Sequence, residues 1–359
     1  MDKSFQVVLM YLITHLGIIF FMSPGNIIAS TDEGHWIPIL AVVIINFILV
    51  SVYMKGLNYF PNEDLVSIYR RYGKVVAFIF LFPVTLYFIM IYILTIRAKS
   101  EIITVILLSE TPLWAIMALL IFISTYLAIK GLETILRTAV LLSCVFIPFI
   151  FFILCLSFQN VDWYYIFPLI DKQFSFIMDS SFYKSFYGVG GALLFLGFIQ
   201  PFVSFQRKQI LIAAIILFPF FIVSVYIPIL TFGQATASTF ILPFEVAMDT
   251  INLNWLMFDR ISMFFLMVLM AFIMLYASLV MWKTTRILNT CLPTIKPIYL
   301  NVTLSSLVFI VCLMIPGWNE IERIILWNTF LEFYTLISVT ISVYYFGFRF
   351  RRGDKYEEN

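Results

Sequence analysis

The sequence predicts an all-α membrane protein with ten transmembrane helices. Of its 359 residues, 62% are hydrophobic and only 12% are charged, a composition that no soluble domain of this size can bury. About 20 mostly apolar residues cross the hydrocarbon core of a lipid bilayer as a helix. Ten stretches meet this criterion, and they lie at residues 5–29, 36–54, 75–96, 112–129, 138–156, 182–205, 210–232, 261–282, 298–315 and 324–346.

The first stretch, 5–29, is expected to remain in the protein as a span, because no small-residue cleavage site follows a short apolar core. Its midpoint holds His15 and Gly17, and Pro24 follows nearer the outer end. Counted from the ends of the span, bilayer depth falls at residues 15–19. We therefore predict a break in this helix at 15–19, with Pro24 as a bend in the outer half-helix.

The connectors are mostly too short to fold independently, so we predict one membrane domain over 1–359. We expect this domain to consist of two repeats of five spans each, at about 5–157 and 182–346, followed by a cytoplasmic tail at 347–359. The inner connector 55–74 has apolar residues at helical spacing opposite basic ones, which predicts a short helix on the inner surface. In the outer connector 233–260, apolar and acidic positions interleave and predict an interfacial helix that can act as a lid: Leu242, Glu245, Val246, Met248, Asp249, Ile251 and Asn252.

The distribution of Lys and Arg predicts the orientation. With a cytoplasmic N-terminus, 16 of the 22 basic residues fall on the inner side. The outer side keeps the remaining six: Arg97, Lys99, Lys172, Lys184, Arg260 and Arg323. Both termini are therefore expected in the cytoplasm. Topology accounts for the basic residues, and the net charge of +2 indicates no nucleic-acid surface.

Ten spans divide into two halves of five that insert with opposite orientations, as in inverted-repeat transporters. In such folds the first helix of each half is discontinuous, and the ligand binds at the two breaks. The sixth span holds Gly188, Gly190 and Gly191, and each glycine costs about 1 kcal/mol of helix propensity relative to alanine. We predict the second break there. Close helix packing around small residues is the alternative at both breaks.

A break at bilayer depth frees backbone N–H and C=O groups, which protein, water or a ligand must satisfy. The positive end of a half-helix fits a carboxylate, so a zwitterionic or anionic small molecule such as an amino acid is expected. The predicted ligand-binding residues are His15, Gly17, Ile18, Ile19, Tyr87, Ile91, Gly188, Val189, Gly190, Gly191 and Tyr276. For the tyrosines, ordinary packing is the alternative.

Two residues are candidates for proton binding at membrane depth, His15 and Glu332. A hydrogen bond from His15 to the broken backbone, or from Glu332 to a neighbouring helix, is the structural alternative for each. The span 138–156 contains no lysine, which excludes a built-in cation there in place of a coupling sodium ion.

The sequence shows no enzyme constellation. It has only two histidines, no HExxH motif, no phosphate-binding glycine loop and no acidic pair at metal-binding spacing within a span. The four cysteines lie in or beside spans without paired spacing and are interpreted as packing residues. We therefore expect no catalytic activity, no metal and no cofactor.

Four segments resemble the B subunit of the spore germinant receptors, the GerAB family of the amino acid/polyamine/organocation superfamily. They read "FPNEDLVSIYRRYGK", "TIRAKSEIITVILLSETPLWAI", "IKGLETILRTAVLL" and "LPFEVAMDTINLNWLMFDRIS". The resemblance implies a ten-helix LeuT-like fold in the inner membrane of a spore. It also implies binding of a nutrient germinant, usually an amino acid, and assembly with a membrane-bound A subunit and a lipoprotein C subunit.

Two positions depart from the pattern of that family. Ile19 stands where the family commonly has the second glycine of Gly-x-Gly, and Gly191 stands where members often carry glutamate. Two other functions remain open at this point. The chain can be a true amino acid transporter that works by alternating access, or a structural or channel-forming subunit that binds no nutrient.

Overall fold

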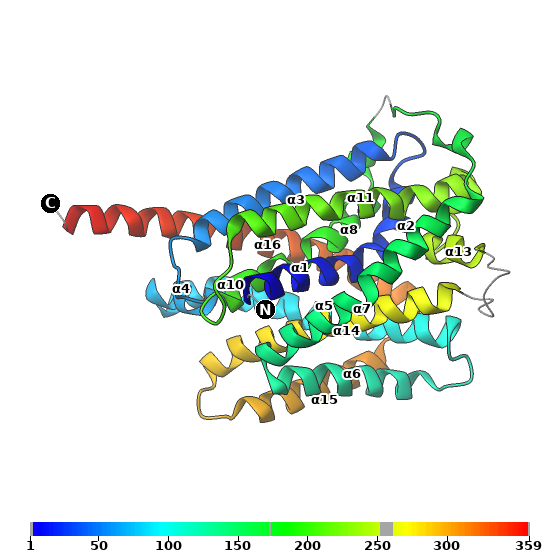
Figure 1. The fold of residues 1–359 in the computed structure, drawn as a ribbon. Coiled ribbons are helices and arrows are strands. Elements are labelled where there is room, and N and C mark those ends of the chain that lie inside the picture. Colours follow the sequence, from blue (N-terminus) through cyan, green and yellow to red (C-terminus); the bar gives the residue numbers. More distant parts are fainter. Residues whose placement is uncertain (1–2, 172–173, 252–260, 358–359) are drawn as a thin grey trace.

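The computed structural model describes residues 3–171, 174–251 and 261–357, which form a helical bundle without β-strands (Figure 1). Its helices, in chain order, are α1 (Lys3–Ile19), α2 (Met22–Ser30), α3 (Trp36–Leu57), α4 (Leu65–Arg71), α5 (Lys74–Ile106), α6 (Leu113–Lys130), α7 (Leu132–Leu156), α8 (Ser180–Ser185), α9 (Tyr187–Gly190), α10 (Leu196–Ile199), α11 (Arg207–Phe232), α12 (Gln234–Ala237), α13 (Pro243–Asp249), α14 (Ile261–Cys291), α15 (Pro297–Met314) and α16 (Trp318–Glu357). Four 3₁₀ turns complete it: η1 (Ser157–Asn160), η2 (Trp163–Ile166), η3 (Ser175–Met178) and η4 (Leu193–Phe195).

Within the described ranges, eight helices are long and apolar enough to cross a membrane, namely α3, α5, α6, α7, α11, α14, α15 and α16. The pair α1 and α2, bent by 55° at its break, is long and apolar enough to form a ninth span if the two helices are counted as one. The predicted sixth span, 182–205, is a chain of short pieces, α8, α9, η4 and α10. The count of ten spans therefore depends on treating these pieces as one broken span.

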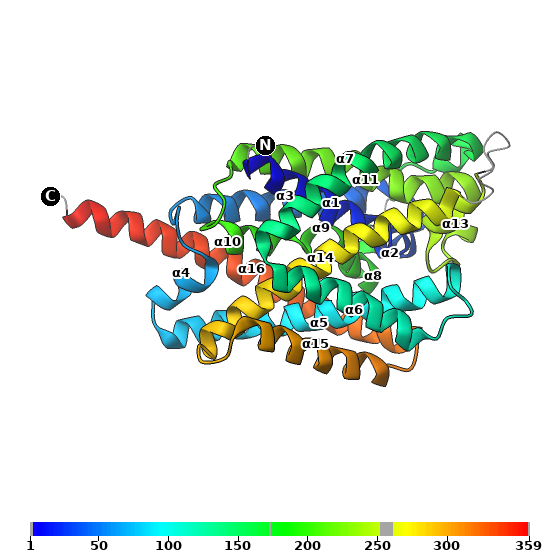
Figure 2. The same cartoon turned by 60° about the horizontal axis from the view of Figure 1, so that its bottom comes forward.

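Helix α14 runs through the centre of the bundle (Figure 2). In its most apolar stretch 78% of residues are buried, against 28% to 44% in the other seven single-helix spans of the described chain. It packs against α1, α5, α6 and α7, and α3 packs against α16. A site built on α14 is therefore shielded from lipid by neighbouring helices.

The first span breaks later than the sequence predicted. Helix α1 continues through Gly17 to Ile19, and the interruption falls at Phe20 and Phe21. The predicted break at 15–19 is therefore wrong in position. Gly17 instead permits close packing of α1 on α14, since a Cβ there would lie 2.9 Å from the Cβ of Phe272. Pro24 is better placed to favour the break, because its ring clashes with the carbonyl of the residue four positions earlier in a continuous helix, which is Phe20.

Three basic residues that the sequence placed in connectors lie inside long helices. Helix α5 extends ten residues beyond the predicted end at 96, so Arg97 and Lys99 are buried, and α14 likewise contains the buried Lys283. Each cation has a partner in the protein. The Nε of Arg97 donates to the carbonyl of Ile315 over 3.1 Å, and the two lysines lie over aromatic rings. These contacts offset part of the cost of burying a charge.

The helices predicted in two connectors are confirmed as α4 and α13. The prediction for α13 was wrong in one respect, because Glu245 is only 6% exposed and faces the protein rather than the interface. Three residues used in the sequence predictions lie outside the described residues: Asn252 of the predicted interfacial helix, and the outer basic residues Lys172 and Arg260. The tail after 346 continues α16 as a helix to Glu357.

Candidate ligand-binding site

The two broken spans touch each other at Gly188. A Cβ on this residue would lie 1.9 Å from the Oγ of Ser23 and 3.6 Å from the Cα of Ile19. The hydroxyl of Ser23 also donates a long hydrogen bond of 3.5 Å to the carbonyl of Ser185. The hydroxyl of Ser23 can rotate away, but the Cβ of Ser23 would lie only 3.0 Å from the added atom, so a side chain at 188 needs α2 and α9 to move apart slightly. Glycine therefore permits the closest contact between the breaks.

A carboxyl group and three tyrosines gather beside this contact. Glu332 on α16 lies close enough to interact electrostatically with the hydroxyls of Tyr87, Tyr187 and Tyr276, which come from α5, α9 and α14. Tyr276 donates a 3.0 Å hydrogen bond to the carbonyl of Gly191. A Cβ at Gly190 would lie 3.5 Å from the Oε1 of Glu332. The second break thus presents its backbone directly to this cluster.

Several buried acceptors of the cluster have no hydrogen-bond partner in the part of the chain that the structure describes. They are the Oε1 of Glu332, the Oδ1 of Asn328 and the hydroxyl oxygen of Tyr87. Glu332 and Tyr87 are at most 1% exposed, and Asn328 is 4% exposed. A buried polar group without a partner costs about 1–3 kcal/mol. Such groups mark a place where a ligand or water completes the structure.

A small cavity adjoins the cluster between α2, α5, α9 and α16. Its volume is about 20 Å³, enough for about one water molecule. Its walls carry both polar and aliphatic side chains: Met22, Ile91, Leu94, Thr95, Ala98, Lys99, Tyr187, Ile325, Asn328, Thr329 and Glu332. An amino acid would need the walls to move apart. The cavity as it stands is therefore too small for an amino acid.

Helix α13 and Lys99 cover the first break. The Nζ of Lys99 lies 3.3 Å from the centre of the Phe21 ring, and Phe20 packs on Phe244 of α13 with ring centres 4.8 Å apart. Glu245 follows Phe244 and interacts electrostatically with Lys99. Burial raises the pKa of Glu245 to about 8, and its own backbone amide and the charge of Lys99 oppose this rise. A buried cation and a buried acid thus lie beside the break, close enough to influence each other electrostatically.

The structure brings together most of the predicted site residues. Those in or beside the cluster are Tyr87, Ile91, Gly188, Gly190, Gly191, Tyr276 and Glu332. Val189 belongs to α9, but its side chain lies outside the described part of the chain.

Of the residues predicted on the first span, Ile19 approaches Gly188 through its backbone, whereas His15, Gly17 and Ile18 lie apart from the cluster. The ring of His15 packs at a tilt against Tyr11 with ring centres 4.1 Å apart, and its Nδ1 hydrogen-bonds the Tyr11 carbonyl over 2.7 Å. Gly17 packs on α14, Ile18 is buried in the core, and Ile19 lines a separate small cavity beside Asn46 of α3. The first span therefore contributes Met22 and Ser23, after the break, and only the backbone of Ile19 from residues 15–19.

The cavity lining includes four residues that were not predicted from the sequence, namely Thr95, Lys99, Tyr187 and Asn328. A signal for two of them is present, since Ile91, Thr95 and Lys99 recur every four residues and so share one face of a helix. Ending the third span at 96 concealed this face. Glu245 was also missed, because an acid beside aliphatic residues is the ordinary pattern of an interfacial helix.

Comparison with known proteins places these features in a family context. The profile of a family of permeases described as "Spore germination protein" matches residues 3–321. "Spore germination protein KB" of Bacillus subtilis (strain 168) is 26% identical over 273 residues, which cover 74% of this chain and 71% of that protein. The crystal structure of MhsT in complex with L-phenylalanine superimposes with a TM-score of 0.60 at 11% identity, over 85% of this chain and 78% of that one. The last match confirms the predicted LeuT-like fold.

Proposed function

The chain belongs to the spore germination protein family of permeases, and from this premise we propose that it is the nutrient-sensing B subunit of a germinant receptor. Its ligand is an amino acid, bound between the two broken spans. One observation carries this proposal, namely the cluster of buried acceptors around Glu332 at the contact between the breaks.

The charges of the cavity match the two ends of an amino acid. An ammonium group has three N–H donors, which suit the unpartnered Oε1 of Glu332 and Oδ1 of Asn328. A carboxylate suits Lys99, which lines the same cavity, and the amide groups at the start of α2. Ile91, Leu94 and Ile325 favour an apolar side chain between them. MhsT, which shares the fold, was solved with the amino acid L-phenylalanine.

The proposal is tested by replacing Glu332 with glutamine. E332Q preserves the volume and removes the charge that pairs with an ammonium group, so amino acid binding to the purified chain should weaken at least tenfold, since a charged hydrogen bond is worth about 1.5–3 kcal/mol. E322Q is the matched control, because Glu322 lies exposed on the same helix and bonds only the indole of Trp318 among the described contacts. Binding of an amino acid with equal affinity to E332Q and the unaltered chain would contradict the assignment of the site.

The remaining parts of the proposal concern assembly and location. The subunit works with a membrane-bound A subunit and a lipoprotein C subunit in the inner membrane of the spore, with both termini in the cytoplasm. It has no catalytic activity. Glu332 is the proposed proton-binding residue of the site, and His15 is the second candidate because it is buried at membrane depth.

A true amino acid transporter is the second candidate function, favoured by the structural match to MhsT. Uptake of radiolabelled amino acids into vesicles that contain only this chain separates the two. A sensor binds without accumulating substrate, whereas concentrative uptake would establish transport. A channel-forming subunit without a nutrient site would leave germinant preference unchanged when the subunit is exchanged between receptors.

A further inference from the structure

A second, larger cavity opens at the end of the molecule that carries α4. It has a volume of about 320 Å³ and lies between α4, the end of α6, the end of α14 and the start of α15. Its lining is rich in hydrogen-bonding groups, among them Ser67, Arg70, Arg286, Asn289, Thr290 and Asn301. None of these residues belongs to the amino acid site proposed above.

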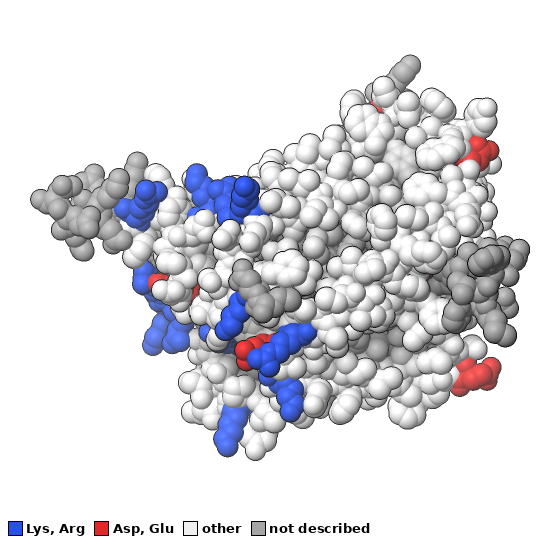
Figure 3. Space-filling model, in the orientation of Figure 1, with Lys and Arg blue, Asp and Glu red and all other residues white. Residues whose placement is uncertain are grey.

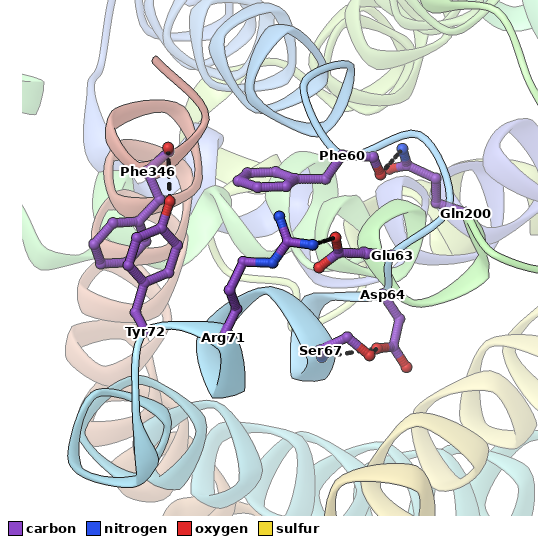
Figure 4. A network of polar contacts seen from close by, with 8 residues as sticks. All are labelled: Phe60, Glu63, Asp64, Ser67, Arg71, Tyr72, Gln200 and Phe346. Carbon is purple, nitrogen blue, oxygen red and sulfur yellow. Dashed lines mark hydrogen bonds and ion pairs between the residues drawn. The ribbon is translucent and has the colours of Figure 1, made fainter. Parts of the chain in front are cut away.

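The wall that α4 contributes is held in place by hydrogen bonds (Figure 4). The Oδ1 of Asp64 caps α4 by accepting from the backbone N–H of Ser67 over 2.8 Å, and Tyr72 donates to the carbonyl of Phe346 over 3.0 Å. The Nε2 of Gln200 donates to the carbonyl of Phe60 over 2.8 Å. The cavity is therefore preformed, because α4 is anchored to α16 and to the end of the sixth span.

The cavity carries a net positive charge. Arg286 pairs with Asp64 over 2.5 Å, so these two charges compensate each other. Arg70 has no ion pair within the described ranges, and its side chain is exposed at the cavity. Lys130 is next to the lining residues Ile129 and Gly131, and its Nζ lies 5.4 Å from the centre of the Tyr126 ring. Arg70 thus lines the cavity and Lys130 directly follows the lining residue Ile129, and neither cation has an acidic partner within the described ranges.

An apolar groove continues from the same side of this cavity. It has a volume of about 570 Å³ and runs between α6 and α15, and Ile129 lines both the cavity and the groove. The lining on α6 reaches from Ala118 to Ile129, which is about 16 Å along a helix that rises 1.5 Å per residue. A 2.5 Å hydrogen bond between Thr125 and Ser305 holds the two helices together at the groove. The groove has the length of most of an acyl chain.

We propose that this cavity and groove together bind one anionic phospholipid. The phosphate lies against Arg70 and Lys130, and an acyl chain lies in the groove between α6 and α15. Basic pockets between transmembrane helices recognise anionic headgroups in this way. A soluble phosphate would use only the cavity and a zwitterionic lipid only the groove, whereas an anionic lipid uses both.

The test is native mass spectrometry of the full-length chain in detergent, titrated with phosphatidylglycerol, phosphatidylcholine or glycerol phosphate. One phosphatidylglycerol should bind, and R70Q should weaken its binding about fivefold, as expected for loss of one cation near an anionic headgroup. Ala118→Phe should also weaken it by filling the groove. R137Q and Leu119→Phe are the controls, since Arg137 is exposed and pairs with Glu133, and Leu119 faces outward next to Ala118. The midpoint of thermal unfolding shows that each variant is folded.

Three outcomes would overturn the proposal. Equal binding of phosphatidylcholine would show that the charges play no part. Equal binding of glycerol phosphate would show that the groove plays none. Phosphatidylglycerol binding that responds to the controls as strongly as to R70Q and Ala118→Phe would place the lipid elsewhere on the surface.

Discussion

Three glycines of this chain have different structural roles. Gly188 permits the two breaks to touch, since its Cβ would lie 1.9 Å from the Oγ of Ser23, and Gly17 permits α1 to pack on α14. Gly317 has no atom within 4 Å of the place where its Cβ would be. Gly17 and Gly188 thus both permit close packing between elements, but only Gly188 lies at the contact between the breaks.

Replacing Gly188 with alanine should separate α2 from α9. Overpacking a tight contact costs about 1–3 kcal/mol, so G188A should lower the midpoint of thermal unfolding and weaken amino acid binding. G317A should change neither quantity, because its methyl group meets open space. Thermal unfolding and binding, measured on the same purified samples, test this expectation. Equal behaviour of the two variants would refute the proposed contact.

Glu245 makes the stability of the protein dependent on pH. Burial raises its pKa from 4.5 to about 8 in the folded protein. Between these values the folded state retains a proton that the unfolded state has lost. Stability should therefore fall as the pH rises from about 4.5 to 8, by at most about 1.4 kcal/mol per pH unit. The charged groups facing Glu245 are Lys99, which opposes this rise in pKa, and Asp249, which adds to it.

E245Q provides the measurement for this expectation. Glutamine has no proton to lose, so the unfolding midpoint of E245Q should change less between pH 5 and pH 8 than that of the unaltered chain. D162N is a control, because Asp162 lies in another outer connector and caps a short turn at an exposed position. If E245Q and the unaltered chain show the same pH dependence, Glu245 is not the titrating group.

At the scale of elements, the break in the first span does not follow from proline alone. Four other prolines, Pro83, Pro148, Pro219 and Pro228, lie inside continuous helices. Transmembrane helices tolerate proline when neighbours satisfy the freed backbone groups. At Phe20 and Phe21 the packing adds a second cause, since Phe20 packs on Phe244 and Phe265, and Phe21 lies under Lys99. These partners come from α13, α14 and α5, so the sequence near the break cannot reveal them.

Helix α4 depends on Asp64 for both its cap and its ion pair. D64A removes both, whereas D64S retains a capping oxygen and loses only the pair with Arg286. A cap is worth about 1 kcal/mol, so D64A should be less stable than D64S by about that amount in thermal unfolding. E133A should have almost no effect, because its pair with Arg137 is exposed. Equal midpoints for D64A and D64S would show that the cap does not stabilise the protein.

At the scale of the whole molecule, charge is separated along the bundle. Basic side chains gather at the end of the bundle that carries α4 and the C-terminal part of α16, and acidic ones are prominent at the opposite end (Figure 3). The first turn of α1 and the last turns of α16 lie toward the basic end (Figures 1 and 2). This arrangement agrees with the orientation expected from the positive-inside rule.

Reporter fusions test the orientation directly. A fluorescent protein that folds only in the cytoplasm should fluoresce when fused after residue 359, and alkaline phosphatase at the same position should be inactive. Alkaline phosphatase fused in the outer connector 157–181 should be active. An active phosphatase at the C-terminus would reverse the proposed topology.

The sequence by itself determined the membrane class, the approximate positions of the long helices and the glycine-rich place where the predicted sixth span is interrupted. It also predicted Tyr87, Tyr276 and Glu332, which the structure brings together, because polar groups at bilayer depth stand out against apolar neighbours. Only the tertiary structure decided where the first helix breaks, and that Lys99 and Glu245 are both buried. The physical reason is that burial of a charge depends on partners from distant helices, such as Phe21 for Lys99. The local sequence shows that burying a charged side chain is unfavourable, but it does not show the contacts with distant helices that offset this cost.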